Sequence, residues 1–173
     1  MSRLRRLVLS DRFFFVTCRL HPKRRFLDAS EFASLARVIR ERRQEHRFLL
    51  TAWVFLPDHW HAILFPRHPL AISEVMEAIK VGSTLRINAS RNEAGVLWQP
   101  RFFDHALRTV KEYHEKVEYI HLNPVRAGLV ERAEDWIWSS IHDYADSAHR
   151  AGEATSGLRT DSVSLPADAR TRI

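Results

Sequence analysis

Hydrophobic residues recur with two different periods along the first part of the chain, and these periods predict two kinds of element. Segments 12–20, 47–56 and 59–65 are rich in aromatic and β-branched residues and predict strands. Between the first two, apolar residues recur at helical spacing, and Asp28 followed by Glu31 is typical of a helix start. The pattern therefore predicts a strand, a helix and then two strands joined tightly as a hairpin.

The following part of the chain predicts another helix, a strand and a third helix. Residues 70–90 repeat apolar positions at helical spacing, and residues 96–108 predict an irregular strand. We expect the third helix to begin at Thr109, to be interrupted near its end by Pro124 and to stop at Gly128.

The order β-α-β-β-α-β predicts a ferredoxin-like α+β fold with an antiparallel sheet, extended here by a C-terminal helix. Helices on one face of such a sheet leave the other face free for a ligand. We predict one domain over residues 1–144. Aromatic residues are absent from residues 145–173, where small and polar residues dominate, so we predict a disordered tail there.

Composition narrows the class of protein. The 173 residues include one cysteine, Cys18, which excludes an intramolecular disulfide framework and a zinc site built on several cysteines. Apolar runs are too short to span a bilayer, and the N-terminus lacks the pattern of a signal peptide. We therefore expect a cytoplasmic protein with no membrane partner.

Positive charge is concentrated in the first third of the chain. The formal net charge is +6 and the pI is about 10.1. Residues 1–50 carry 13 Lys and Arg against 5 Asp and Glu. Most of this charge is arginine, whose guanidinium binds phosphate through two parallel hydrogen bonds, so the charge favours nucleic acid as a partner. A solvated basic surface is the alternative.

Two histidines on the third predicted strand are the first candidate site. Because residues i and i+2 of a strand point the same way, His59 and His61 share one face, where two imidazoles could bind a divalent ion. A chain with 10 histidines also produces such pairs by chance, so two surface histidines remain the alternative.

Tyr119 on the third predicted helix is the second candidate. It lies off the apolar stripe of that helix and shares a face with Asn123, four residues later. Asn123 could therefore place an amide oxygen beside the phenol. A half-buried structural tyrosine is the alternative, and Tyr113 is a competitor on a different face of the helix.

Four sequence blocks carry a resemblance to a known family. They are PDHWHAIL at 57–64, LWQPRFFDH at 97–105, YIHLNPVRAGLV at 119–130 and DWIWSS at 135–140. Together, in this order, they resemble the REP-associated tyrosine transposases, which are single-tyrosine members of the HUH endonuclease superfamily. The resemblance covers about residues 1–144, and the order of predicted elements agrees with it.

The resemblance implies a metal-dependent enzyme that cleaves and rejoins single-stranded DNA near hairpin repeats. Tyr119 matches the nucleophile, which forms a 5′-phosphotyrosine and leaves a free 3′-hydroxyl. His59 and His61 match the metal-binding pair, and Asn123 matches a third ligand. The implied ion is Mg²⁺ or Mn²⁺, with zinc as an alternative. One departure, Pro100-Arg101 after the Trp-Gln pair, affects local strand geometry.

Two other classes of function are weighed against this enzyme. A nucleotide hydrolase with three alternating histidines would need a third histidine at position 63, where this chain has Ile63. A non-catalytic regulator that binds hairpin DNA would explain the basic residues, although no recognition-helix pattern is present.

Single-stranded or hairpin DNA is the expected partner of a monomer or homodimer. The basic residues that we expect to help bind it are Arg12, Arg19, Lys23, Arg24, Arg25, Lys80, Arg86, Arg101 and Arg108.

Overall fold

The computed structural model describes residues 11–148 and 160–161. In chain order its elements are β1 (Phe14–Arg19), α1 (Ala29–His46), β2 (Leu49–Phe55), β3 (His59–Phe65), α2 (Ile72–Arg91), β4 (Phe103–Ala106), α3 (Val110–Arg126), the 3₁₀ helix η1 (Ala133–Asp135) and α4 (Ile141–Ala148).

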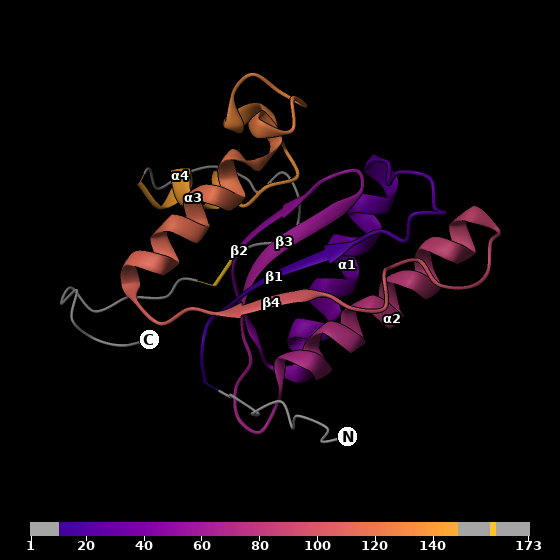
Figure 1. Cartoon of the computed structure of the whole chain (residues 1–173), viewed down its shortest axis with the longest axis horizontal. Helices are drawn as coiled ribbons and strands as arrows, with labels where there is room; N and C mark the ends of the chain where they lie inside the picture. The colour runs from indigo at the N-terminus through magenta and orange to yellow at the C-terminus, as the bar shows by residue number, and fades with distance from the viewer. Residues whose placement is uncertain (1–10, 149–159, 162–173) are drawn as a thin grey trace, which may run out of the picture.

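The strands form one four-stranded sheet in the order β2-β3-β1-β4 (Figure 1). All three neighbouring pairs are antiparallel. Two β-α-β units that interleave in this way make the ferredoxin-like arrangement, so the predicted α+β fold is confirmed.

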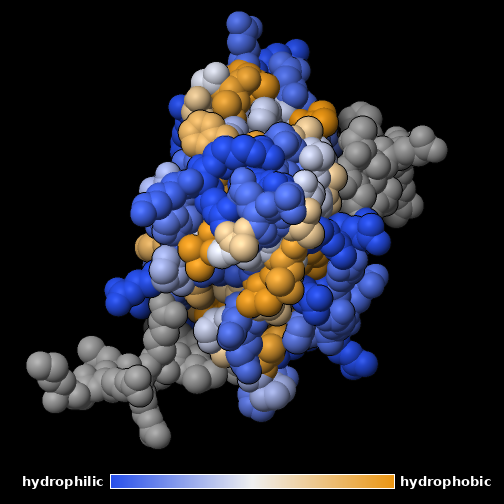
Figure 2. All heavy atoms as spheres, turned by 90° about the vertical axis from the view of Figure 1, so that its right-hand side faces the viewer, coloured by the Kyte–Doolittle hydropathy of each residue, from blue (hydrophilic) through white to orange (hydrophobic). Residues whose placement is uncertain are grey.

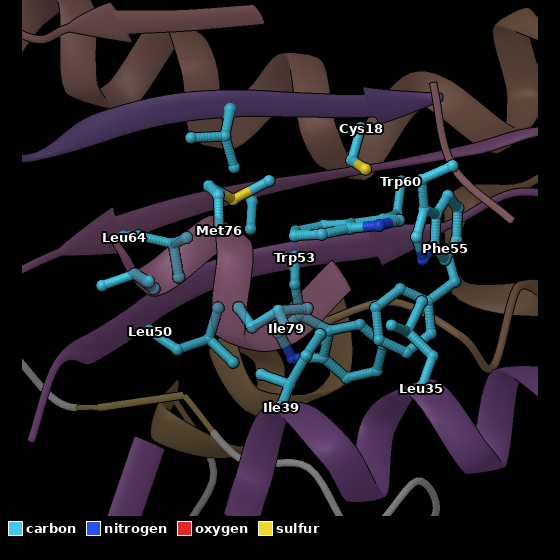
Figure 3. Close-up of a cluster of buried hydrophobic side chains, with 14 of the residues drawn as sticks. Cys18, Leu35, Ile39, Leu50, Trp53, Phe55, Trp60, Leu64, Met76 and Ile79 are labelled. Atoms are coloured by element: carbon cyan, nitrogen blue, oxygen red, sulfur yellow. The ribbon is translucent and has the colours of Figure 1, made fainter. Parts of the chain in front are cut away.

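Helices α1 and α2 cover one face of the sheet. Their apolar stripes pack on alternate residues of the strands, including Trp53 and Trp60, which are fully buried (Figure 3). Gly82 of α2 lies against Val38 of α1, and a Cβ at Gly82 would come within 2.9 Å of Val38 Cγ1. The glycine that weakens the middle of the helix therefore allows the two helices to approach closely.

The opposite face of the sheet is not left free, contrary to the sequence prediction. Helix α3 covers part of it, because its stripe of Tyr113, Val117 and Ile120 is buried against the residues of β1, β2 and β3 on that face. The prediction erred because it treated α3 as an addition to the fold and not as a second covering layer. The uncovered part of this face is therefore smaller than predicted and lies next to α3.

Two element boundaries also differ from the prediction. The fourth strand is only Phe103–Ala106, at the edge of the sheet, and Trp98 forms a single isolated bridge with Leu20. Helix α3 continues through Pro124 to Arg126, because a proline in the last turn removes only one hydrogen bond of the helix. The chain then turns at Gly128, whose φ of 67° suits glycine.

The N-terminus of α1 has the predicted cap and is also tied to the end of α2. Asp28 accepts a hydrogen bond from the backbone N–H of Glu31, and the Glu31 carboxylate accepts one from Asp28 N, which is a capping box. The same carboxylate binds Arg91 of α2 at 2.6 Å and 2.9 Å, and both side chains are almost completely buried. Arg25, which is half exposed, adds a third contact at 2.8 Å.

We expect Glu31→Gln to lower the free energy of unfolding by about 3 kcal/mol, because it leaves the buried Arg91 charge without its partner. Burial alone would raise the Glu31 pKa, but hydrogen bonds from Arg91 outweigh it and hold the pKa below 4.5. The stabilisation is therefore complete above pH 4.5 and is lost as the pH falls through the lowered value. Urea unfolding from pH 3 to pH 7 measures both effects.

Arg25→Ala is the matched control for this prediction. Arg25 binds the same carboxylate from an exposed position, so its removal should cost about 1 kcal/mol or less. Equal losses of unfolding free energy in Glu31→Gln and Arg25→Ala would show that the buried Glu31–Arg91 pair does not hold the helices together.

The C-terminal part of the described chain lies against β2. Helix α4 runs past the predicted domain boundary at Ala145 to Ala148. Asp161 exchanges hydrogen bonds with the backbone of Leu50, its N–H donating at 2.7 Å and its carboxylate accepting at 2.7 Å. The rest of the predicted tail, residues 149–159 and 162–173, lies outside the described residues. Among the helices of the described part, none has the length and apolar character needed to cross a membrane.

Candidate functional site

The two histidines of β3 converge on the face of the sheet that α3 covers. Their Nε2 atoms lie 3.1 Å apart. On the far side of each ring, Nδ1 is engaged: His59 Nδ1–H donates to Asp58 at 2.6 Å, and His61 Nδ1 is hydrogen-bonded to the Thr17 hydroxyl at 2.8 Å. Thr17 is the residue opposite His61 in the β1–β3 ladder. These partners fix the rings so that both Nε2 atoms point to one place.

His61 is held in the neutral form. Burial lowers its pKa from 6.5 to about 3, and electrostatic repulsion from the neighbouring His59 and Arg19 side chains acts in the same direction. A neutral imidazole has a lone pair on one nitrogen, which is the form that binds a metal ion.

Tyr119 of α3 lies next to this pair. Its ring centroid is 5.4 Å from that of His61 and 5.7 Å from that of Phe15, both in edge-to-face contact. Two cations flank the same ring, with Lys116 Nζ at 5.4 Å and the Arg126 guanidinium at 5.3 Å from its centroid. The half-buried phenol is thus placed among imidazoles and positive charges.

Tyr113, the competing tyrosine, has a structural role. It is 4% exposed, and its hydroxyl is hydrogen-bonded to that of Tyr144 at 3.3 Å. Tyr144 in turn donates to the carbonyl of Thr51 at 2.6 Å, and burial raises its pKa. Both hydroxyls therefore belong to the packing of α3 and α4 on the sheet.

The donor set fits a divalent ion. Two imidazoles with anchored Nδ1 atoms present their Nε2 atoms together, as in many metal sites. Within the part of the chain that the structure describes, no three His, Cys, Asp or Glu side chains converge on one point. A third protein ligand from that part would need another chemistry, and Asn123, buried one turn after Tyr119, carries an amide oxygen. Its role as a ligand stays a prediction.

The sequence of this chain matches that of a known family over the same elements. The model of the family described as "Transposase IS200 like" matches residues 13–123, from the start of β1 to Asn123. A REP-associated tyrosine transposase of Escherichia coli (strain K12) is 33% identical over 143 residues, which are 82% of this chain and 84% of the relative. The chain belongs to the REP-associated tyrosine transposases.

Two further comparisons agree with this membership. A solved structure of a REP-associated tyrosine transposase bound to a REP hairpin has a TM-score of 0.74 and 30% identity, and covers 95% of this chain and 100% of that one. A Haemophilus influenzae protein assigned to the same group is 25% identical over 152 residues, 82% of this chain and 86% of its own length.

Four side chains around the histidine pair and Tyr119 were not singled out from the sequence as site residues. They are Thr17, Asp58, Lys116 and Arg126. For Asp58, the position next to His59 was a usable signal, because metal-binding histidines commonly donate to a carboxylate. Lys116 was also within reach of sequence reasoning, because it lies three residues before Tyr119 on the same helix. Thr17 is revealed only by its pairing with His61 in the β1–β3 ladder, and Arg126 only by its contact with the Tyr119 ring.

The Arg24 side chain binds groups of its own chain. Its guanidinium donates to the carbonyls of Ala94 at 2.6 Å and Val96 at 2.8 Å, and also binds Glu93. The turn after α2 is thereby fastened to the loop after β1. Three more of the basic residues predicted to bind DNA also contact acceptors of the chain, namely Arg25 with Glu31, Lys80 with the carbonyl of Gln99, and Arg86 with Glu41.

The remaining predicted DNA-binding residues are more accessible to a bound DNA strand. Lys23, Arg101 and Arg108 are exposed and form no ion pair with any described residue, whereas Arg12 is half-buried. Arg19 is 54% exposed and stands opposite His59 in the β1–β3 ladder. Contact with DNA stays a prediction for all nine residues.

Proposed function

We propose that this protein cleaves and rejoins single-stranded DNA next to hairpin repeats through a covalent bond to Tyr119. The observation that carries the proposal is the edge contact of Tyr119 with His61, whose Nε2 lies 3.1 Å from that of His59. The proposed nucleophile and the proposed metal-binding pair, which are far apart in the sequence, thus lie together. Membership of a transposase family supports the same reaction class.

In the proposed first step, the Tyr119 hydroxyl oxygen attacks the scissile phosphorus and loses its proton. The bond from phosphorus to the 3′-oxygen breaks, and that oxygen leaves as a 3′-hydroxyl after it takes up a proton. The 5′-phosphate is then esterified to Tyr119. Lys116 and Arg126, which flank the ring, are positioned to bind phosphate oxygens of the bound strand.

A divalent ion such as Mg²⁺ or Mn²⁺, held by His59, His61 and Asn123, would polarise the scissile phosphate and stabilise the charge that develops on it. Asp58 and Thr17 keep the two imidazoles oriented for this task. The buried position of His61 keeps its ring neutral and able to bind the ion.

Rejoining is the reverse of cleavage. A 3′-hydroxyl attacks the phosphotyrosine, the bond from phosphorus to Tyr119 breaks, and the phenol takes back a proton. One phosphodiester is exchanged for another, so no nucleotide cofactor is needed for this step.

We further propose hairpin DNA as the substrate. A relative of 30% identity is described as bound to a REP hairpin, and its fold covers 95% of this chain. The assay that tests the proposal incubates labelled hairpin DNA carrying single-stranded flanks with protein and Mn²⁺. Cleavage with a covalent adduct supports it, whereas binding without cleavage would favour a regulator.

Replacing Lys23 and Arg101 together by alanine should weaken DNA binding and its dependence on salt. Both side chains are exposed and without an ion pair among the described residues, so they can bind phosphate without first losing a partner. We expect the slope of log K against log salt to fall by about 1.4–1.8, or 0.7–0.9 per contact. Titrations at several salt concentrations measure it.

Arg24→Ala is the informative comparison. Because Arg24 fastens two loops, its replacement should mainly lower stability and leave the salt slope nearly unchanged. An unchanged slope in the Lys23 and Arg101 double variant would show that these residues are merely solvated.

A further inference from the structure

A hollow of about 230 Å³ lies next to Asp58, the hydrogen-bond partner of His59. It opens between the end of β1, the basic loop that follows β1 and the start of β3. Its walls include Arg19, His21, Phe26, Asp58 and Gln99. The walls thus combine one phenyl ring, two arginines (Arg19 and Arg24) and several other polar groups.

Phe26 is 68% exposed although the chain around it is anchored. On one side, Arg24 is bound to the carbonyls of Ala94 and Val96. On the other side, Leu27 is buried and its N–H donates to the carbonyl of Pro57 at 2.8 Å. A phenylalanine fixed in this way presents its ring to solvent without freedom to fold inward.

This hollow is directly connected to the proposed catalytic centre. Asp58 lines it and also accepts the hydrogen bond of His59 Nδ1 at 2.6 Å. Arg19 lines it, stands opposite His59 in the β1–β3 ladder and lies 3.7 Å from Asp58. A ligand in the hollow is therefore one side chain away from the metal-binding pair.

On the side of the molecule that Figure 2 faces, most of the surface is hydrophilic and hydrophobic atoms gather in separate patches. That side includes the C-terminal end of α2 in Figure 1. Exposed apolar side chains on and near α2 are Phe26, Val81, Leu85 and Val96. Among these four, only Phe26 lines the hollow next to Asp58.

We propose that this hollow is a subsite for one unpaired nucleotide next to the scissile phosphate, with its base stacked on Phe26 and its phosphate paired with Arg19. The inference rests on the proposed function, because it requires a single-stranded substrate at the histidine pair. Aromatic side chains bind unpaired bases by stacking, and a guanidinium beside the ring supplies the charge for the backbone. The subsite sets which nucleotide of the flank lies next to the cleaved bond.

The test measures binding in the Tyr119→Phe background, with a hairpin that carries single-stranded flanks and with the bare hairpin. Phe26→Ala should weaken binding of the flanked hairpin about 5- to 150-fold, the range for loss of one base–aromatic stack, and leave the bare hairpin unaffected. Phe26→Leu should lose as much, because it keeps apolar bulk but no ring, whereas Phe26→Trp should bind like the parent. Leu85→Ala, which is also at a 68% exposed position, is the control and should change nothing.

A series of flanks with one abasic position each locates the base. At one position the abasic site should weaken binding by the parent but add no further loss to Phe26→Ala, since both changes remove the same stack. Equal affinities of Phe26→Ala and the parent for the flanked hairpin would overturn the subsite. An equally large loss of affinity for the bare hairpin would also overturn it. So would losses of binding free energy from the abasic site and from Phe26→Ala that add at every position of the flank.

These outcomes are separate from those of the proposed function. If the abasic site and Phe26→Ala are non-additive, we call them coupled. If this coupling is found but wild-type protein never cleaves, the nucleotide subsite stands and the catalytic proposal is wrong. If wild-type protein cleaves and the coupling is absent, the catalytic proposal stands and the subsite is wrong. Because Phe26 is mostly exposed, thermal melts of its variants should match the parent.

Discussion

Tyr119→Phe should abolish DNA cleavage while DNA binding survives. The change removes the oxygen that attacks phosphorus, so no covalent intermediate can form. The ring remains, with its contacts to His61 and Phe15 and the flanking cations Lys116 and Arg126. Stability should change by about 1 kcal/mol or less, because one hydroxyl is lost from a half-buried position.

The measurement is a gel assay on hairpin DNA labelled at either end, followed by mass spectrometry. With wild-type protein, the 5′-labelled fragment should migrate as free DNA with a 3′-hydroxyl, and the 3′ fragment should stay attached to the peptide that contains Tyr119. Tyr113→Phe is the matched control, because its hydroxyl is paired with Tyr144 inside the packing. It should still cleave, and an adduct on Tyr113 or Tyr144 would overturn the mechanism.

His61→Ala should lower the cleavage rate by at least about 100-fold, because an ion that stabilises transition-state charge contributes several kcal/mol and 1.36 kcal/mol is a factor of ten. His59→Ala should do the same, and the double variant should be little worse than either single one, since the two rings act as one unit. Excess chelator should inactivate the wild type, and added Mg²⁺ or Mn²⁺ should restore it.

Two further measurements separate loss of the ion from loss of the fold. His61 is 3% exposed, so its truncation also removes buried volume, whereas the His59 side chain is 13% exposed and its variant is the safer probe. Calorimetric titration with Mn²⁺ should show binding to the wild type and none to His59→Ala. His114→Ala, at an exposed position of α3, should keep both metal binding and cleavage. Full activity of His61→Ala or in chelator would rule out the metal assignment.

Sequence patterns predicted an element correctly where residues close together in the chain determine it. Asp28 and Glu31 form the expected capping box because both partners lie within one turn of the same helix. The third strand coincides with its prediction, 59–65, and its period of two places His59 and His61 together. The fourth strand is shorter than predicted because its ladder with β1 is interrupted between Gln99 and Phe103, where Pro100 has no N–H to donate.

The basic residues show what a count of charges leaves undecided. Arg24 and Lys23 are neighbours in a loop that the sequence assigns to DNA, yet Arg24 fastens that loop to the turn after α2 while Lys23 is exposed. Arg91, which the sequence did not single out, is buried with Glu31. Which arginine meets an acceptor of its own chain depends on how α1 and α2 pack, and this packing involves residues distant in sequence.

The sequence by itself determined the ferredoxin-like order of elements, the pairing of His59 with His61 and the family, because each depends on periodicity or on short blocks of residues. Only the tertiary structure decided that Tyr119, and not Tyr113, stands beside those histidines. Both tyrosines lie on one helix, and their difference arises from how α3 is rotated as its apolar stripe packs on the sheet. That rotation is set by long-range contacts, as are the Thr17 hydrogen bond to His61 and the exposure of Phe26 beside Asp58.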